Sequence, residues 1–290
     1  MFLATYKTSM KTLLRDLVLW IAICILIGLL IHRAELVAYV QAIVDDNGAL
    51  LGHITDKDVS FDMSFKAYVQ KVFHLRSNMM LYILPLFTIL SVASLLSRDM
   101  RDNFFEVQKA GGVSARDYFL GRVTALFTLN ALIALIGSFL NFHWYFLSRH
   151  GVSFFSAWEY FTDSTVRILR LYALAIIPSL IFFIALPYVL ITVTKSSFLG
   201  SALSLGYVLF QYEANSILRM RLPQVYHDFM NVIPSNMYMY WGWYDTEWFY
   251  EKTRHNPFTP GQLILATGII LSLSTLFFII SYFHTKKREI

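Results

Sequence analysis

The feature that most constrains this chain is a series of long apolar runs with almost no charged residues in them. A helix needs about 20 such residues to cross the hydrocarbon core of a bilayer, whereas the strands of a membrane barrel are about ten residues long and alternate in polarity. The chain is 57% hydrophobic and 15% charged, and soluble domains have about 25% charged residues. We therefore predict an all-α polytopic membrane protein with one transmembrane domain over residues 1–290. The expected spans are 17–33, 77–97, 118–148, 167–194, 196–216 and 260–284.

The polar segments between these runs fall into two sets that differ in length and charge. The short set consists of 1–16, 98–122, Lys195 and 284–290, with twelve basic and six acidic residues. The long set carries twelve basic and thirteen acidic residues in far more chain. Short loops rich in lysine and arginine stay in the cytoplasm. We expect a multi-pass protein of the cell membrane with both termini cytoplasmic, and we attribute its net charge of +5 to topology rather than to a nucleic-acid partner.

Residues for catalysis or metal binding form no recognisable pattern. The single cysteine, Cys24, lies inside the first apolar run, and the eight histidines are scattered, without the close spacing of a metal site. A membrane-embedded protease would need Gly-x-Ser-Gly with a histidine on another span, paired aspartates, or His-Glu-x-x-His, and none of these occurs. We predict no catalytic residue and no metal ligand.

The cytoplasmic segment 98–116 carries the most information. Met100, Phe104 and Val107 stand at i, i+4 and i+7, which places them in one apolar stripe on a charged helix. Gly111–Gly112 is a suitable helix stop, and Ser114 with an acid three residues later is suited to cap the next helix. Phe104 and Phe105 are expected to be exposed unless lipid or a partner covers them. The segment is then either an interfacial helix or a knob for a cytoplasmic partner.

This pattern of a charged amphipathic helix, glycine, Val–Ser, arginine and Gly–Arg before the third span resembles the membrane subunit of ABC-2-type transporters. The likeness covers the whole chain in topology and about 25 residues in motif. Asp99–Met100–Arg101–Asp102–Asn103 departs from the acidic motif common in that family, and Gly112 stands where many members have proline. The resemblance implies an exporter fold with an N-terminal elbow helix at 1–16, a coupling helix in 98–116, and short re-entrant or interfacial helices in the outer region 217–259.

The resemblance also implies partners and a function. The chain has no G-x-x-x-x-G-K-[ST] phosphate loop, so ATP and magnesium would be held by two copies of a separate ATPase subunit, and this chain would carry no cofactor. A second membrane subunit would complete a homodimer or a heterodimer. The expected function is ATP-driven export of a hydrophobic or amphipathic substrate such as a peptide, lipid-like molecule or drug. A secondary transporter, or a membrane peptide-binding or immunity protein without an ATPase, is the alternative. The residues expected to couple to the ATPase are Met100, Phe104, Phe105, Glu106 and Val107.

The fifth span and the outer loops leave further alternatives open. Ser197, Ser201 and Ser204 put small residues on one helix face, which suits close helix packing or a translocation path. Glu213 near the end of this span is either functional or a plain interfacial residue. The outer loop 34–76 has a helical apolar pattern over 34–44 and again over 61–73, with a turn at 45–48 between them. The outer loops 149–166 and 217–259 complete that side, and the aromatic 217–259 is either an interfacial belt or an outer gate.

Overall fold

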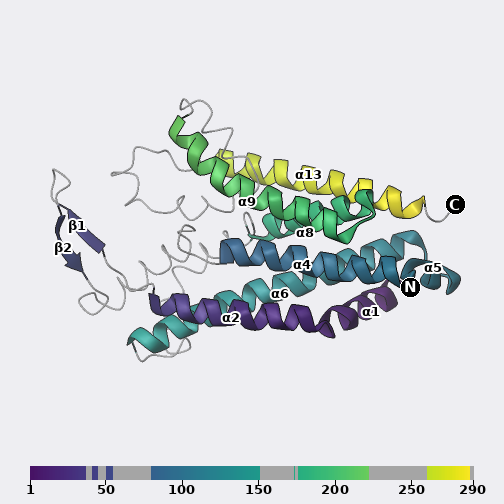
Figure 1. Ribbon diagram of the computed structural model, residues 1–290, viewed down its shortest axis with the longest axis horizontal. Coiled ribbons are helices and arrows are strands. Elements are labelled where there is room, and N and C mark those ends of the chain that lie inside the picture. The colour runs from purple at the N-terminus through teal and green to yellow at the C-terminus, as the bar shows by residue number, and fades with distance from the viewer. Residues whose placement is uncertain are drawn as a thin grey trace.

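The computed structural model describes residues 1–36, 41–44, 50–54, 80–150, 173, 176–221 and 260–287 (Figure 1). Within these residues the chain forms long helices that run roughly along one axis, and both termini lie at the same end of the bundle. The helices are α1 (Phe2–Leu14), α2 (Leu17–Leu36), α4 (Met80–Arg101), α5 (Phe104–Ala110), α6 (Ala115–His150), α8 (Ile177–Thr194), α9 (Ser197–Arg221) and α13 (Pro260–Lys286).

One short hairpin corrects the all-α expectation. Strands β1 (Gln41–Val44) and β2 (Leu50–Ile54) pair antiparallel, with Gln41 opposite Ile54, at the end of the molecule away from the termini (Figure 1). The helix predicted over 34–44 is therefore wrong from Gln41 on, where cross-strand pairing prevails over a helical spacing of apolar residues. The turn at 45–48 and the helix at 61–73 lie outside the described residues, as do most of 149–166 and 217–259.

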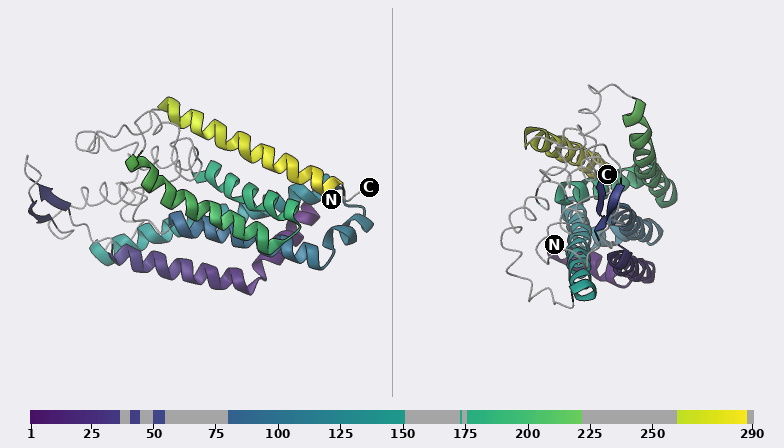
Figure 2. Two further views of the ribbon diagram at one scale, coloured as in Figure 1. Left: turned by 45° about the horizontal axis from the view of Figure 1, so that its top comes forward. Right: turned by 90° about the vertical axis from the view of Figure 1, so that its left-hand side faces the viewer.

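The break between α1 and α2 is produced by a buried aspartate. Asp16 accepts a hydrogen bond from the backbone N–H of Val18 at 2.9 Å, so it caps the start of α2. The same carboxylate accepts a hydrogen bond from Ser94 and forms an ion pair with Arg98 at 3.2 Å, which fixes the corner to α4. Figure 2 shows α1 running at a steep angle to α2. The expected N-terminal elbow is thus a separate helix.

α8 is the central helix. It packs against α13, α9, α4 and α6, and 67% of it is buried within the chain. A helix that is apolar on all sides has to be covered by protein or by lipid, and α8 is covered mainly by protein. α8 is joined to α9 by the tight turn expected at Lys195, whose φ is 54°. Just past this turn Gly200 lies against α8, and a Cβ there would come within 2.6 Å of the Ile191 nitrogen.

The helices leave large apolar surfaces exposed, which indicates that a bilayer surrounds the protein. α13 is as apolar as α8, yet only 28% of its span is buried, and Leu265, Leu276 and Phe283 are exposed on it. Exposed apolar faces of this size mark a membrane or a partner. Among the described residues, three helical stretches are long and apolar enough to span a bilayer, namely Ala115–Ile136, Ile177–Thr194 and Ile264–Lys286. The chain is thus a helical membrane protein, and three of the six expected spans meet this criterion.

Candidate functional site

The candidate site is the short helix α5 and the ends of α4 and α6 that hold it, at the same end of the bundle as both termini (Figure 1). α4 ends at Arg101, and Asn103 takes a left-handed conformation with φ of 46°. Asparagine tolerates that conformation better than most residues. Met100 and Phe104 therefore belong to two different helices, and the single stripe predicted for Met100, Phe104 and Val107 is wrong.

The signals that end α5 and begin α6 act as predicted. α5 stops at Ala110, and the N–H of Gly112, whose φ is 82°, donates to the Lys109 carbonyl at 2.8 Å. The positive φ explains why glycine is suited to that position. The Ser114 hydroxyl then accepts the N–H of Asp117 at 3.1 Å, so it caps α6. The end of α5 and the start of α6 are therefore set by the backbone conformation of Gly112 and by the Ser114 cap.

Phe105 anchors α5 to the bundle. Its side chain is only 4% exposed, and its ring meets that of Tyr118 edge to face, with the centroids 4.7 Å apart. Ala115 completes this small buried cluster. The expectation that Phe105 needs lipid or a partner to cover it is wrong, because the chain covers it. Burying a phenylalanine stabilises a fold by about 1.5–3 kcal/mol, so α5 is held firmly in place.

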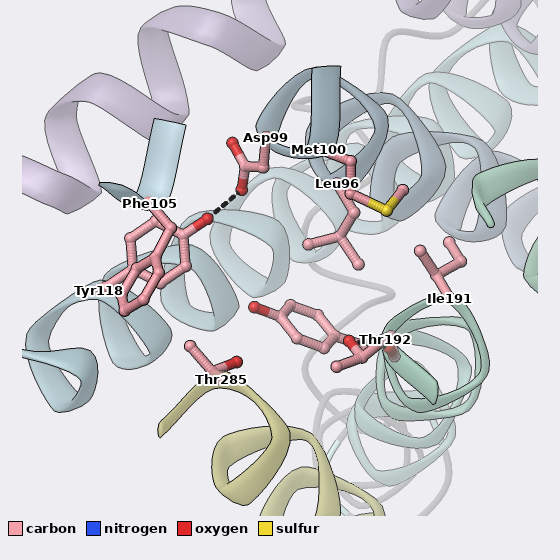
Figure 3. Close-up of a pocket in the computed structure, with 9 residues that line it drawn as sticks. Leu96, Asp99, Met100, Phe105, Tyr118, Ile191, Thr192 and Thr285 are labelled. Atoms are coloured by element: carbon pink, nitrogen blue, oxygen red, sulfur yellow. Dashed lines mark hydrogen bonds between the residues drawn. The ribbon is translucent and has the colours of Figure 1, made fainter. Parts of the chain in front are cut away.

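A buried ion pair ties the same cluster to α4. Arg122 of α6 is fully buried and pairs through Nη2 with a carboxylate oxygen of Asp99, whose side chain is 9% exposed. The Tyr118 hydroxyl donates to the other oxygen of that carboxylate at 2.5 Å, and Figure 3 shows these two side chains facing each other. Both oxygens of Asp99 therefore have partners on α6.

The guanidinium of Arg122 is also covered by aromatic rings. Its central carbon lies 4.7 Å from the ring centre of Phe104 and 5.1 Å from that of Tyr118, a geometry in which a cation is attracted to the ring faces. The Nε and Nη1 atoms are buried without a hydrogen-bond partner. The charge of Arg122 is thus held by one carboxylate and two rings, one of which belongs to α5.

A small cavity lies beside this cluster, between α4, α5, α6, α8 and α13. Its volume is about 40 Å³, which is room for a few water molecules and too little for an organic substrate. It is lined by Leu96, Asp99, Met100, Phe105, Tyr118, Tyr188, Ile191, Thr192 and Thr285 (Figure 3). The cavity is therefore a packing gap between five helices and not a ligand-binding site.

The outer face of α5 is open. Glu106 and Lys109 are exposed, and Val107 is 64% exposed. Beside them, Arg101 and Asp102 form an exposed ion pair at 2.8 Å, and the hydrogen bond from Arg101 lowers the pKa of Asp102 below its usual value. α5 therefore presents a solvent-facing surface of mixed charge around one apolar side chain, while its opposite side is buried against the bundle.

The residues predicted for the site lie in different parts of the structure. Met100 lies near the end of α4, Phe104 and Phe105 lie on the bundle side of α5, and Glu106 and Val107 lie on its outer side. The serines predicted on the fifth span are on α9, where Ser204 is fully buried and donates to the Gly200 carbonyl at 2.7 Å. This face packs against α8 at Gly200. Glu213 lies within α9, with its side chain outside the described part.

Sequence reasoning missed Asp99, Tyr118 and Arg122 as site residues. The available signal was the position of Arg122 inside the predicted span 118–148, because charged residues at membrane depth are costly and need partners. In the portions of the chain that the structure describes, no group of three histidine, cysteine or acidic residues is placed to hold a metal ion.

Comparison with protein-family models and with curated proteins finds no match to this chain.

Proposed function

We propose that this chain is the membrane-spanning subunit of an ATP-driven transporter of the ABC-2 type, with six spans and with α5 as the helix that couples it to a separate ATPase. The observation that carries the proposal is α5 itself. It is a short helix between two long ones, anchored by a buried Phe105, with an outer face open to a partner around Val107.

The contacts of α5 suit a part that transmits motion. Phe105 contacts Tyr118 of α6, and Phe104 covers Arg122, which is paired with Asp99 of α4. A force on the outer face of α5 would therefore reach the ends of both α4 and α6. Rigid elements with shared packed contacts carry coupling of this kind. A nucleotide-driven switch further requires that ATP stabilise one of two states of the membrane dimer over the other.

The arrangement of the other elements is compatible with this function. Both termini and α5 lie at one end (Figure 1), and Lys11, Arg101, Lys109 and Lys286 lie in the last turns of helices there, as expected for a cytoplasmic side. α1 forms an elbow before α2. In this proposal ATP and magnesium are bound by two partner ATPase chains, two membrane subunits form the transport path, and the cargo is hydrophobic or amphipathic and is exported.

The test is purification from native membranes, followed by mass spectrometry of the accompanying chains and measurement of ATP hydrolysis. We expect a chain with a phosphate loop to accompany the wild type. Glu106→Lys with Val107→Asp changes only exposed side chains, so it should leave the fold intact and weaken ATPase association about tenfold or more, as the loss of a central interface residue does.

Lys287→Glu is the matched control, because it reverses an exposed charge at the same end of the molecule, directly after α13 rather than on α5. It should keep both the partner and its activity. Absence of any phosphate-loop chain from the wild-type complex would refute the proposal and favour a secondary transporter or a peptide-binding protein. Equal losses in the α5 variant and the control would show that α5 has no special role.

A further inference from the structure

α1 has two opposite faces, and only one of them is used by the chain. Thr5, Ser9 and Leu13 are almost fully buried, at a spacing that puts them on one side of the helix. That side meets α6 so closely that a Cβ at Gly121 would come within 2.8 Å of the Thr5 Cβ. Packing against α6 therefore fixes the rotation of α1 about its own axis.

The opposite face carries a row of cations. Lys7, Lys11 and Arg15 have the same four-residue spacing, and Lys7 is displaced from Thr5 by two residues, or about 200° around the helix. All three are exposed, whereas the stripe against α6 is not. The first acid in the chain is Asp16, which is buried and paired with Arg98. None of the described acids forms an ion pair with the three cations.

Large apolar side chains lie beside these cations on the exposed side. Leu3 and Leu14 are 57% and 46% exposed, and Leu3 stands one turn before Lys7. Exposed leucines interleaved with lysines are unfavourable in water. They suit the boundary of a bilayer, where apolar side chains enter the acyl region and lysine extends its ammonium group to the headgroups.

The junction with α2 places this row at headgroup level. The Trp20 indole N–H donates to the Leu14 carbonyl at 2.6 Å, so an exposed tryptophan closes the corner between α1 and α2. Tryptophan favours the membrane–water interface. From this corner α2 continues with exposed Leu17, Ile21 and Ile25, a face that needs lipid. Arg15 is thus at the last turn before the apolar surface begins.

We propose that Lys7, Lys11 and Arg15 form a binding site for anionic lipid headgroups on the outer face of α1. The occupant is the phosphate of an anionic phospholipid, because the cation row and the exposed leucines require charge and acyl chain together. Clusters of basic residues next to a membrane helix attract such lipids. The site does not depend on an ATPase partner, so its test is independent of the test of the proposed function.

The test measures binding of phosphatidylglycerol and of zwitterionic phosphatidylcholine to the detergent-purified full chain by native mass spectrometry. We expect the wild type to prefer phosphatidylglycerol. Lys7→Gln/Lys11→Gln/Arg15→Gln should weaken that binding on the order of 100-fold and leave phosphatidylcholine binding unchanged. Replacing the two lysines by arginine, which keeps the charge, should preserve the preference. All of these side chains are exposed, so the unfolding temperature without lipid should not change.

Lys286→Gln/Lys287→Gln/Arg116→Gln is the matched control, since it removes two exposed lysines and one exposed arginine at the same end and leaves α1 intact. It should retain the preference for phosphatidylglycerol. An equal loss in both triple variants would overturn the proposal in favour of a general effect of positive charge. Competition by inorganic phosphate as strong as that by phosphatidylglycerol would also overturn it, because a free anion would then be the ligand.

Discussion

Removal of Arg122 should destabilise the protein through the charge that it leaves behind on Asp99. Both side chains are buried, with 1% and 9% exposed, and breaking a buried ion pair by deleting one partner costs about 3–5 kcal/mol. Tyr118 still donates to Asp99 in the variant, so the lower end of that range applies. Arg122→Met should therefore lose about 3 kcal/mol of unfolding free energy.

The partner substitution and the double variant separate the ion pair from general packing. Asp99→Leu leaves a buried guanidinium that already has two nitrogens without partners, so its cost should be similar. The double variant Asp99→Leu/Arg122→Met removes both charges, and replacing a buried pair by apolar residues is often nearly neutral. We expect the double variant to be more stable than either single variant, with a coupling energy of about 2–3 kcal/mol.

The assay is thermal unfolding in detergent, followed by tryptophan fluorescence and checked for reversibility with an increasing fraction of denaturing detergent. For a chain of this length a change of about 3 kcal/mol corresponds to roughly 5 °C in the unfolding midpoint. Arg122→Lys serves as the control, because it keeps the charge and loses the flat stacking on Phe104, and it should cost only about 1 kcal/mol. Additive effects in the double variant, or losses below about 1 kcal/mol in both single variants, would refute this account of the site.

Two further substitutions test the packing that positions the site, both by the same unfolding measurement. Gly121→Ala places a Cβ 2.8 Å from that of Thr5, so it should cost about 1–3 kcal/mol through displacement of α1. Gly206→Ala is the control: it has open space around it and should be neutral or stabilising by up to about 1 kcal/mol. Equal effects of the two substitutions would show that α1 does not pack on α6 at this point. Asn130 of α6 donates a hydrogen bond to Ser91 at 3.0 Å and accepts one from Thr88 at 2.9 Å, both on α4. Asn130→Leu should therefore cost about 0.6–2 kcal/mol of unfolding free energy. A gain in stability would mean that these hydrogen bonds do not hold the two helices together.

The helix boundaries near the site could be predicted because the signals are local. Gly111–Gly112 ends α5, Ser114 begins α6, and Lys195 forms the turn between α8 and α9. Each of these features depends on the conformation or the hydrogen bond of one or two residues. The long apolar helices could be predicted for the same reason, since a continuous run of apolar residues needs no knowledge of its neighbours.

The orientation of α5 could not be predicted, because it depends on a break of two residues. The left-handed Asn103 changes the phase between α4 and α5, so the i, i+4, i+7 pattern does not continue across it. Phe104 and Phe105 are adjacent and equally apolar, and the one that is buried, Phe105, is the one whose ring packs on Tyr118 and Ala115 of α6. The partner of Arg122 was hidden for a related reason, since Asp99 is 23 residues away and is one of several acids in the segment.

The basic residues of the short polar segments show what a count of charges predicts and what it does not. The count predicts which end faces the cytoplasm, because that depends only on how many lysines and arginines lie near the membrane. The role of each cation depends on the helix face that it occupies. Arg98 and Arg122 pair with Asp16 and Asp99 inside the bundle, so they hold helices together. Lys7 and Lys11 on α1 face outward, opposite the side of that helix that approaches α6 closely at Gly121. The spacing within α1 separates its cations from its buried stripe, but which of the two faces packs on another helix depends on the surface that α6 offers at Gly121.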